Sequence, residues 1–210
     1  MPHPNLFVLE HPLIQQNLYY LRDKNSNSLN FRSALDEIGA LMVYEVTREF
    51  KLISKEVETP LEKTTGYILE KEVTLVPILR AGLAMCDGIL KLIPQARVGH
   101  LGLYRDKTTL KPVEYYCKFP PNIEESEVII IDPMLATGGS AVAAVDYIKN
   151  RKVESIRFVC LVASPEGIAL MAEKHPEVPI YTAALDRQLN DHGYILPGLG
   201  DAGDRIYGTE

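Results

Sequence analysis

From residue 73 onward, short apolar runs alternate with segments whose apolar residues recur at helical spacing. The apolar runs are nearly continuous, so the strands that they predict are buried on both faces, as in a parallel sheet covered by helices. We expect strands at residues 73–79, 97–104, 127–132, 156–164 and 178–185, and helices at residues 81–93, 138–151 and 165–175. This order predicts an α/β fold with an open, doubly wound, mainly parallel sheet flanked by helices.

The segment before residue 73 has a different pattern. Residues 5–10 are typical of a short strand or an extended arm. Residues 11–23 predict a helix with one apolar stripe, made of Leu13, Ile14, Leu18 and Leu21. Ser33 is expected to cap a second, long helix, because the apolar positions after it recur at helical spacing. We therefore expect N-terminal helices over residues 11–57, before a core at residues 73–185.

One segment interrupts the alternation of strands and helices. Residues 103–121 are polar at their centre and alternate around Val113, Tyr115 and Cys117. This pattern predicts a β-hairpin that leaves the sheet as an arm, with residues 106–109 near its tip. A long protruding element in a compact domain often covers a site or joins a partner.

Composition narrows the class of protein. The 210 residues fit a single domain over residues 1–210 with a full core. No apolar stretch reaches about 18 residues and the start lacks a signal-peptide pattern, so we expect a cytoplasmic protein without a membrane partner. The net charge of −6 argues against a nucleic-acid partner, which needs a basic face. Three widely spaced cysteines without a C-x-x-C predict reduced core thiols, namely Cys86, Cys117 and Cys160.

The clearest candidate site is the strand-to-helix turn after residue 131. A buried strand delivers Asp132 to the carboxyl edge of the sheet, where open α/β sheets bind ligands. Thr137, Gly138, Gly139 and Ser140 then open a helix, and its free N–H groups and dipole attract phosphate. Asp132 accepts hydrogen bonds only, which suits a sugar diol. The alternative is a plain glycine turn with a helix cap; a P-loop is excluded because no lysine follows the glycines.

These residues carry a resemblance to a known family. Residues 132–140, "DPMLATGGS", resemble the phosphoribosyl-pyrophosphate (PRPP) motif of type I phosphoribosyltransferases. Most of that superfamily has two adjacent acids at the strand end, whereas Pro133 follows Asp132 here, as in the uracil phosphoribosyltransferase branch. Other stretches similar to that branch are residues 77–85, 99–106, 110–118 and 194–209. The resemblance implies a Mg²⁺-dependent enzyme that transfers the phosphoribosyl group of PRPP to uracil, giving UMP and pyrophosphate.

Two arginines at strand ends are candidates for binding pyrophosphate. Arg80 precedes Ala81 and Gly82, which are small enough for a close approach to a ligand, and an arginine forms charge-assisted hydrogen bonds to phosphate groups. Arg105 lies where the expected hairpin leaves the core. The alternatives are a surface arginine that caps a turn and an exposed ion pair, respectively. The resemblance implies that both bind pyrophosphate, and that a non-proline cis peptide often lies near Arg80.

A third candidate is the glycine-rich loop near the C-terminus, where Gly198, Gly200 and Gly203 spell G-x-G-x-x-G. A dinucleotide fingerprint needs a strand before it and a helix after it within about 30 residues. Here Pro197 precedes the glycines and only seven residues follow Gly203, which excludes a dinucleotide-dependent oxidoreductase. The backbone groups of such a loop can instead complement the donors and acceptors along one edge of uracil.

The resemblance assigns roles to these segments. It implies a base-binding loop at residues 190–207, with uracil bound by Ile195, Gly200, Asp201 and Ala202. Arg105 and Asp201 would be catalytic, and Mg²⁺ would be held mainly by PRPP and water, with Asp201 as a possible ligand. The implied PRPP-binding residues are Arg80, Arg105, Asp132, Pro133, Met134, Leu135, Ala136, Thr137, Gly138, Gly139, Ser140 and Asp201.

Several neighbouring residues have structural interpretations. Asp204 and Arg205 could form an internal ion pair that holds the loop. Tyr194 is expected near the base, and His192 is expected at the surface because its spacing offers no catalytic partner. Two lysines of the arm, Lys107 and Lys111, are expected to be solvated.

Two alternatives to a uracil enzyme stay open. One is a phosphoribosyltransferase that uses a different base. The other is a non-catalytic RNA-binding regulator with the same fold, against which the negative net charge counts. The resemblance also suggests a homo-oligomer (a dimer or larger) and a possible GTP effector.

Overall fold

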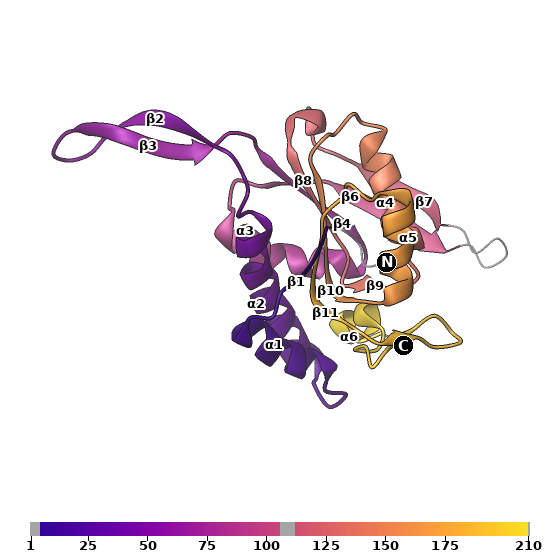
Figure 1. Ribbon diagram of the computed structural model, residues 1–210. Helices are drawn as coiled ribbons and strands as arrows, with labels where there is room; N and C mark the ends of the chain where they lie inside the picture. The colour runs from indigo at the N-terminus through magenta and orange to yellow at the C-terminus, as the bar shows by residue number, and fades with distance from the viewer. Residues whose placement is uncertain (1–4, 106–111, 210) are drawn as a thin grey trace.

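The computed structural model describes residues 5–105 and 112–209 (Figure 1). A nine-stranded sheet runs in the order β1-β11-β10-β8-β4-β6-β7, with β5 beside β4 and β9 beside β10. Among the described strands of this sheet, only β7 is antiparallel to its neighbour. The strands are β1 (Leu6–Val8), β4 (Val73–Leu79), β5 (Arg97–Val98), β6 (His100–Arg105), β7 (Pro112–Lys118), β8 (Glu127–Ile131), β9 (Met134–Leu135), β10 (Ile156–Ala163) and β11 (Ile180–Leu185). The predicted fold class is confirmed.

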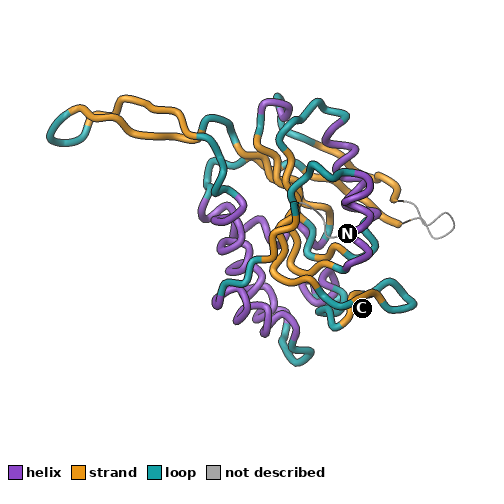
Figure 2. The backbone as a smooth tube through the Cα atoms, in the orientation of Figure 1, coloured by secondary structure: helices purple, strands orange, loops and turns teal. Residues whose placement is uncertain are grey.

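Helices cover both faces of this sheet, as Figure 2 shows. One layer contains α1 (Pro12–Arg22), α2 (Ser28–Val46) and α3 (Cys86–Leu92), and the other contains α4 (Gly139–Lys149) and α5 (Pro165–Lys174). Within β8, Ile129 and Ile131 pack with the first layer while Val128 and Ile130 pack with the second. Successive side chains of a strand point to opposite faces, so a continuous apolar run fills two cores.

The N-terminal prediction needs three corrections. Helix α2 begins at Ser28, and the side chain of Asn27, not Ser33, caps it by accepting from Asn30 N–H at 2.9 Å. Leu13 is 51% exposed, so it does not share the buried stripe of α1. Helix α2 ends at Val46, whereas the predicted helical segment continued to residue 57.

The segment that follows α2 is a β-hairpin instead of a helix. Strand β2 (Leu52–Glu58) pairs antiparallel with β3 (Lys63–Leu69) over seven residue pairs, and the hairpin extends away from the body (Figure 1). Its strands contact each other rather than the main sheet. The local pattern of β2 does not reveal its partner strand, which explains why the sequence prediction was wrong here.

Strands β6 and β7 pair antiparallel, as a hairpin at residues 103–121 requires, but both belong to the main sheet, so their described residues do not leave the sheet as the predicted arm. Strand β7 forms an edge of the main sheet. The predicted tip, with Lys107 and Lys111, lies outside the described residues. None of the helices in the described ranges is long and apolar enough to cross a membrane.

All three cysteines are unpaired, as predicted. Cys86 and Cys160 are buried, and burial raises the pKa of each thiol to about 12. Cys117 is half-buried, and burial raises its pKa as well.

Candidate functional site

The parallel strands β4, β8 and β11 end at the same edge of the sheet. A charged residue follows each of them at or next to the strand end: Arg80 after β4, Asp132 after β8 and Asp186 after β11. Ligands of open α/β sheets bind outside the carboxyl ends of the strands. This edge is therefore the place where a site is expected.

The turn after β8 leads into α4 through Gly138. This residue is the N-cap of α4 and has a φ of +82°, in the left-handed region that favours glycine. A Cβ at Gly138 would lie 3.0 Å from the carbonyl oxygen of Gly167, so the loop packs closely against α5. The first turn of α4 has no acidic side chain, and Thr137 and Ser140 are exposed beside it. The free N–H groups of this helix start can bind a phosphate.

The Asp132 carboxyl group is half-buried at the end of β8. Burial raises its pKa from 3.8 to about 7, because the charged form loses contact with water. Its Oδ1 accepts a hydrogen bond from Met134 N–H at 3.3 Å, and this bond lowers the pKa by a smaller amount. Asp132 therefore changes charge near neutral pH in the free protein.

This raised pKa predicts a pH-dependent stability. The folded protein binds a proton that the unfolded chain releases, so the stability contributed by Asp132 is lost as pH rises from 3.8 toward 7. The Asp132→Asn variant stays neutral, and at pH 8 its free energy of unfolding should exceed that of the wild type by roughly 1–3 kcal/mol. The difference should shrink toward pH 4. Urea denaturation at pH 4 and pH 8 measures the free energy of unfolding of both proteins. An equal difference at the two pH values would contradict the prediction. The control is Glu154→Gln, which removes an exposed carboxylate.

The loop after β4 brings Arg80 to the same edge. The Leu79–Arg80 peptide bond is cis, in agreement with the resemblance. A Cβ at Gly82 would lie 2.3 Å from the carbonyl oxygen of Ile131. Gly82 therefore approaches the backbone of β8, rather than a ligand as the sequence suggested.

The Arg80 side chain is 59% exposed. One guanidinium nitrogen lies 3.8 Å from Asp204 Oδ1, and the guanidinium carbon lies 5.6 Å from the centre of the Tyr207 ring. The Tyr207 hydroxyl donates to the Arg80 carbonyl oxygen at 3.1 Å. These weak, exposed contacts leave the guanidinium able to bind an anion. Arg105 is the last residue of β6, and its side chain lies outside the described part of the structure.

The C-terminal loop closes the site through β12 (Gln188–Leu189), β13 (Ile195–Leu196) and α6 (Ala202–Tyr207). Asp201 caps α6, and its Oδ1 accepts from Asp204 N–H at 3.0 Å. A cavity of about 250 Å³ lies between this loop and the turn after β8. Its lining residues are Ala81, Met134, Ala136, Gly193, Tyr194, Ile195, Gly200, Asp201, Ala202 and Gly203.

This cavity brings together several residues that the sequence proposed separately. Met134 and Ala136 come from the expected PRPP motif, and all four expected uracil-binding residues line the same space. Tyr194 is also present. Pro133 and Leu135 are buried in the fold and do not line the cavity, so only their backbone could face PRPP.

The predicted Asp204–Arg205 ion pair is wrong. Arg205 donates to three carbonyl oxygens, those of Leu199 at 2.8 Å, Asp23 at 2.5 Å and Leu21, and its guanidinium lies 4.4 Å from the centre of the Phe31 ring. Asp204 lies near Arg80 and accepts from the Thr209 hydroxyl at 2.7 Å. His192 is exposed, as expected. Adjacent residues on a helix point in different directions, which is why this pair does not form.

The sequence prediction missed Asp186 and Arg22. The Asp186 side chain is only 5% exposed and forms a two-point ion pair with Arg22 beside the C-terminal loop. Asp186 directly follows a buried apolar strand, which is the signal that identified Asp132. Nothing in the pattern around Arg22 indicates this contact.

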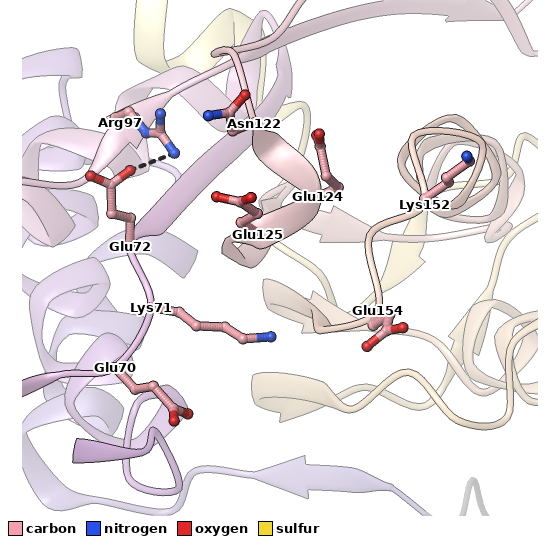
Figure 3. Close-up of a pocket in the computed structure, with 9 residues that line it drawn as sticks. All are labelled: Glu70, Lys71, Glu72, Arg97, Asn122, Glu124, Glu125, Lys152 and Glu154. Atoms are coloured by element: carbon pink, nitrogen blue, oxygen red, sulfur yellow. Dashed lines mark ion pairs between the residues drawn. The ribbon is translucent and has the colours of Figure 1, made fainter. Parts of the chain in front are cut away.

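A second hollow of about 760 Å³ lies at the opposite, amino-terminal end of the strands (Figure 3). It contains none of the predicted site residues, and an ion pair of 2.6 Å joins Arg97 to Glu72 at its wall. Its lining residues are Glu70, Lys71, Glu72, Arg97, Asn122, Glu124, Glu125, Lys152 and Glu154. Its position at the wrong end of the sheet argues against a role as the active site.

No group of three or more histidine, cysteine, aspartate or glutamate residues with metal-binding geometry occurs within residues 5–105 and 112–209. Mg²⁺ usually keeps several waters and binds one or two carboxylates together with substrate phosphates. Asp201, with one carboxylate oxygen outside the α6 cap, fits such a partial site.

Comparisons with known proteins identify the family. The family model for uracil phosphoribosyltransferase matches residues 8–209. A protein of Geobacillus kaustophilus named uracil phosphoribosyltransferase is 57% identical over 206 residues, which cover 98% of this chain and 99% of the relative. A relative of the same name from Finegoldia magna is 59% identical over 204 residues, covering 97% and 98%, respectively.

Solved structures agree with the fold. A protein of Aquifex aeolicus superimposes with a TM-score of 0.92 at 39% identity and covers 96% of this chain and 97% of its own. A hypoxanthine-guanine phosphoribosyltransferase of Bacillus anthracis has a TM-score of 0.51 at 15% identity, with 76% and 79% covered, and shares the fold alone. The match over nearly the full length, together with the converging loops at the sheet edge, shows that the chain belongs to the uracil phosphoribosyltransferase family.

Proposed function

We propose that this protein transfers the phosphoribosyl group of PRPP to uracil, giving UMP and pyrophosphate. The observation that carries the proposal is the cavity of about 250 Å³ in which Gly200, Asp201 and Ala202 face Met134 and Ala136 of the PRPP motif. A base held there lies beside the segment proposed to hold the ribose. The names of relatives at 57% and 59% identity support the same reaction.

The proposed mechanism uses the three segments at the sheet edge. The helix start at Thr137–Ser140 binds a phosphate of PRPP through backbone N–H groups and hydroxyls. Asp132, once ionised, accepts hydrogen bonds from the ribose hydroxyls. Arg80 and Arg105 stabilise the charge that develops on pyrophosphate as its bond to C1′ breaks. Uracil N1 forms the new bond to C1′ from the opposite face and loses its proton.

Mg²⁺, when bound, neutralises charge on the pyrophosphate oxygens. We assign its protein contact to Asp201, with PRPP and water as the other ligands. The same carboxylate faces the reacting ribose, where its negative charge favours the oxocarbenium character of C1′.

Specificity for uracil would arise from the backbone of the C-terminal loop. Main-chain groups of Ile195, Gly200 and Ala202 present fixed donors and acceptors to one edge of the base. Cytosine carries an amino group where uracil has a carbonyl, so it would leave a buried backbone donor unpaired. Such a mismatch is strongly selective because an unpaired buried polar group is costly.

We also propose that the protein forms a homo-oligomer through the β2–β3 hairpin. Isolated two-stranded hairpins are only marginally stable, and this one extends from the body with several exposed apolar side chains. They are Leu52, Ile53, Val57, Leu61, Tyr67 and Ile68. Packing against a second copy would remove this apolar surface from water.

One set of assays tests these proposals. Pyrophosphate release is measured with PRPP, Mg²⁺ and each of uracil, cytosine, hypoxanthine and orotate. We expect turnover with uracil only, its loss when Mg²⁺ is chelated, and a particle larger than one chain by light scattering. Addition of GTP tests the effector, and a rate that GTP leaves unchanged would argue against it.

The outcomes separate the alternatives. Turnover with another base would reassign the substrate within the same fold. Absence of turnover with every base, together with RNA binding at physiological salt, would favour the regulator. A monomeric particle would contradict the role of the hairpin.

A further inference from the structure

An ion pair lies behind the C-terminal loop, between two elements that are distant in the sequence. Asp186 follows β11 at the carboxyl edge of the sheet, and Arg22 is the last residue of α1. Their side chains form two hydrogen bonds, Nη2 to Oδ1 at 2.6 Å and Nη1 to Oδ2 at 2.9 Å. The Asp186 side chain is 5% exposed and that of Arg22 is 25% exposed. A two-point contact of this kind fixes the relative orientation of both side chains.

The same two side chains also hold one residue of the loop. Asp186 Oδ2 accepts from Gly198 N–H at 2.9 Å, and Arg22 Nη1 donates to the Gly198 carbonyl oxygen at 2.8 Å. Both backbone groups of Gly198 are therefore bound by the ion pair. Gly198 has a φ of +61°, and a Cβ there would lie 2.2 Å from the carbonyl oxygen of Ile195. Only glycine fits this position.

The next residue of the loop is held in a related way. Arg205 donates to the Leu199 carbonyl oxygen at 2.8 Å while it also binds carbonyl oxygens at the end of α1. Arginine side chains therefore restrain two consecutive peptide groups, the one between Gly198 and Leu199 and the one between Leu199 and Gly200. Gly200 and Asp201 line the cavity assigned to the base.

Recognition of a base by backbone groups depends on the orientation of those groups. If the peptide groups of the loop can rotate, they can present an acceptor to cytosine as readily as a donor to uracil, and selectivity is lost. Ordering such a loop when the base binds also costs free energy, which weakens the affinity. Charge-assisted hydrogen bonds in a half-buried site hold the peptides in one orientation before the base arrives. The ion pair therefore restrains the segment proposed to bind the base.

We propose that Arg22 and Asp186 are positioning residues that hold the base-binding loop in the orientation that recognises uracil. This inference rests on the proposed function. It predicts that loosening the ion pair weakens binding of the base and its selectivity more than binding of PRPP, because most of the proposed PRPP contacts lie outside this loop.

The test is Arg22→Lys. Lysine keeps the positive charge but lacks the planar guanidinium group, which donates to Asp186 and to the Gly198 carbonyl oxygen at the same time. We expect the KM for uracil to rise by about 10-fold, and the preference in kcat/KM for uracil over cytosine to fall by about 5-fold. The Kd of PRPP, measured by calorimetry, should change less than about 2-fold. Asp186→Asn, which keeps the shape and removes the charge, should act in the same direction.

The matched control is Arg157→Lys. Arg157 forms a partly buried ion pair with Glu127 at the opposite end of the sheet, with an Nη1–Oε2 distance of 2.6 Å and side chains 13% and 14% exposed. Its loss should lower the thermal stability without a selective effect on the KM for uracil. An equal effect of both variants on this KM, or a parallel rise in the KM for uracil and the Kd of PRPP, would overturn the inference.

A second readout does not depend on the substrate. Hydrogen exchange of the Gly198 and Leu199 amides should be about 10-fold faster in Arg22→Lys than in the wild type, because the peptides they belong to are less restrained. Unchanged exchange at these amides would overturn the positioning role. A wild-type protein that does not use uracil would contradict the proposed function, and faster exchange in the variant would still support the positioning role.

Discussion

Replacing Asp201 with asparagine should lower turnover of uracil with PRPP by about 10²–10³-fold, the range typical of losing one electrostatic contact in a preorganised site. Asp201 lines the cavity between the C-terminal loop and the turn after β8, and we propose that its charge acts on Mg²⁺ and the ribose there. The substitution isolates the charge, because Asp201 is also the N-cap of α6 and asparagine is an equally good cap. The loss should appear in kcat and not in the melting temperature.

Two further variants make this result interpretable. Asp201→Ala removes both the charge and the cap, so it should lose activity and also about 1 kcal/mol of stability. Glu154→Gln removes an exposed carboxylate in the hollow at the opposite end of the sheet and should leave turnover unchanged. Wild-type turnover in Asp201→Asn would show that the charge of Asp201 has no part in the reaction.

Replacing Gly82 with alanine should affect both stability and catalysis. The added Cβ would lie 2.3 Å from the Ile131 carbonyl oxygen and 3.3 Å from the Pro77 Cα, which are backbone atoms that cannot move aside independently. Overpacking of this kind costs about 1–3 kcal/mol, and the loop that carries Arg80 must move away from β8. We expect a fall in melting temperature and a decrease of at least about 10-fold in kcat/KM for PRPP, since small displacements of positioning groups are costly.

The control for the stability of Gly82→Ala is Gly139→Ala. A Cβ at Gly139 meets only the Thr137 hydroxyl oxygen, at 3.9 Å, so its melting temperature should stay close to that of the wild type. Melting curves of the two variants, recorded side by side, measure the difference. A Gly82→Ala protein with wild-type stability and activity would show that the contact with β8 relaxes without consequence.

The pattern of apolar residues was sufficient to predict the main sheet. Strands β4, β8 and β10 each contribute side chains to two hydrophobic clusters, and this double burial produces the nearly continuous apolar runs at residues 73–79, 127–131 and 156–163. Local sequence carries this information because burial acts on each strand separately. The helix start at Gly138 was predictable for the same reason, since a glycine turn after a buried strand is a local signal.

The β2–β3 hairpin shows where local pattern is insufficient. All seven residues of β2 are exposed, so no burial pattern marks the segment as a strand. Its extended conformation depends on pairing with β3, and the prediction of a helix to residue 57 failed for that reason. The cap of α2 is likewise Asn27, whereas the sequence prediction placed it at Ser33.

Local pattern was sufficient to predict the α/β fold and the order of strands and helices after residue 73, and short motifs were sufficient to propose the segments of the site. The side chains that hold those segments could not be predicted, because they meet only through tertiary contacts. Arg22 and Asp186 are 164 residues apart, and Arg205 binds carbonyl groups more than 180 residues away. Contacts over such separations exist only once the sheet has brought its carboxyl ends and the end of α1 together, so neither spacing nor composition records them.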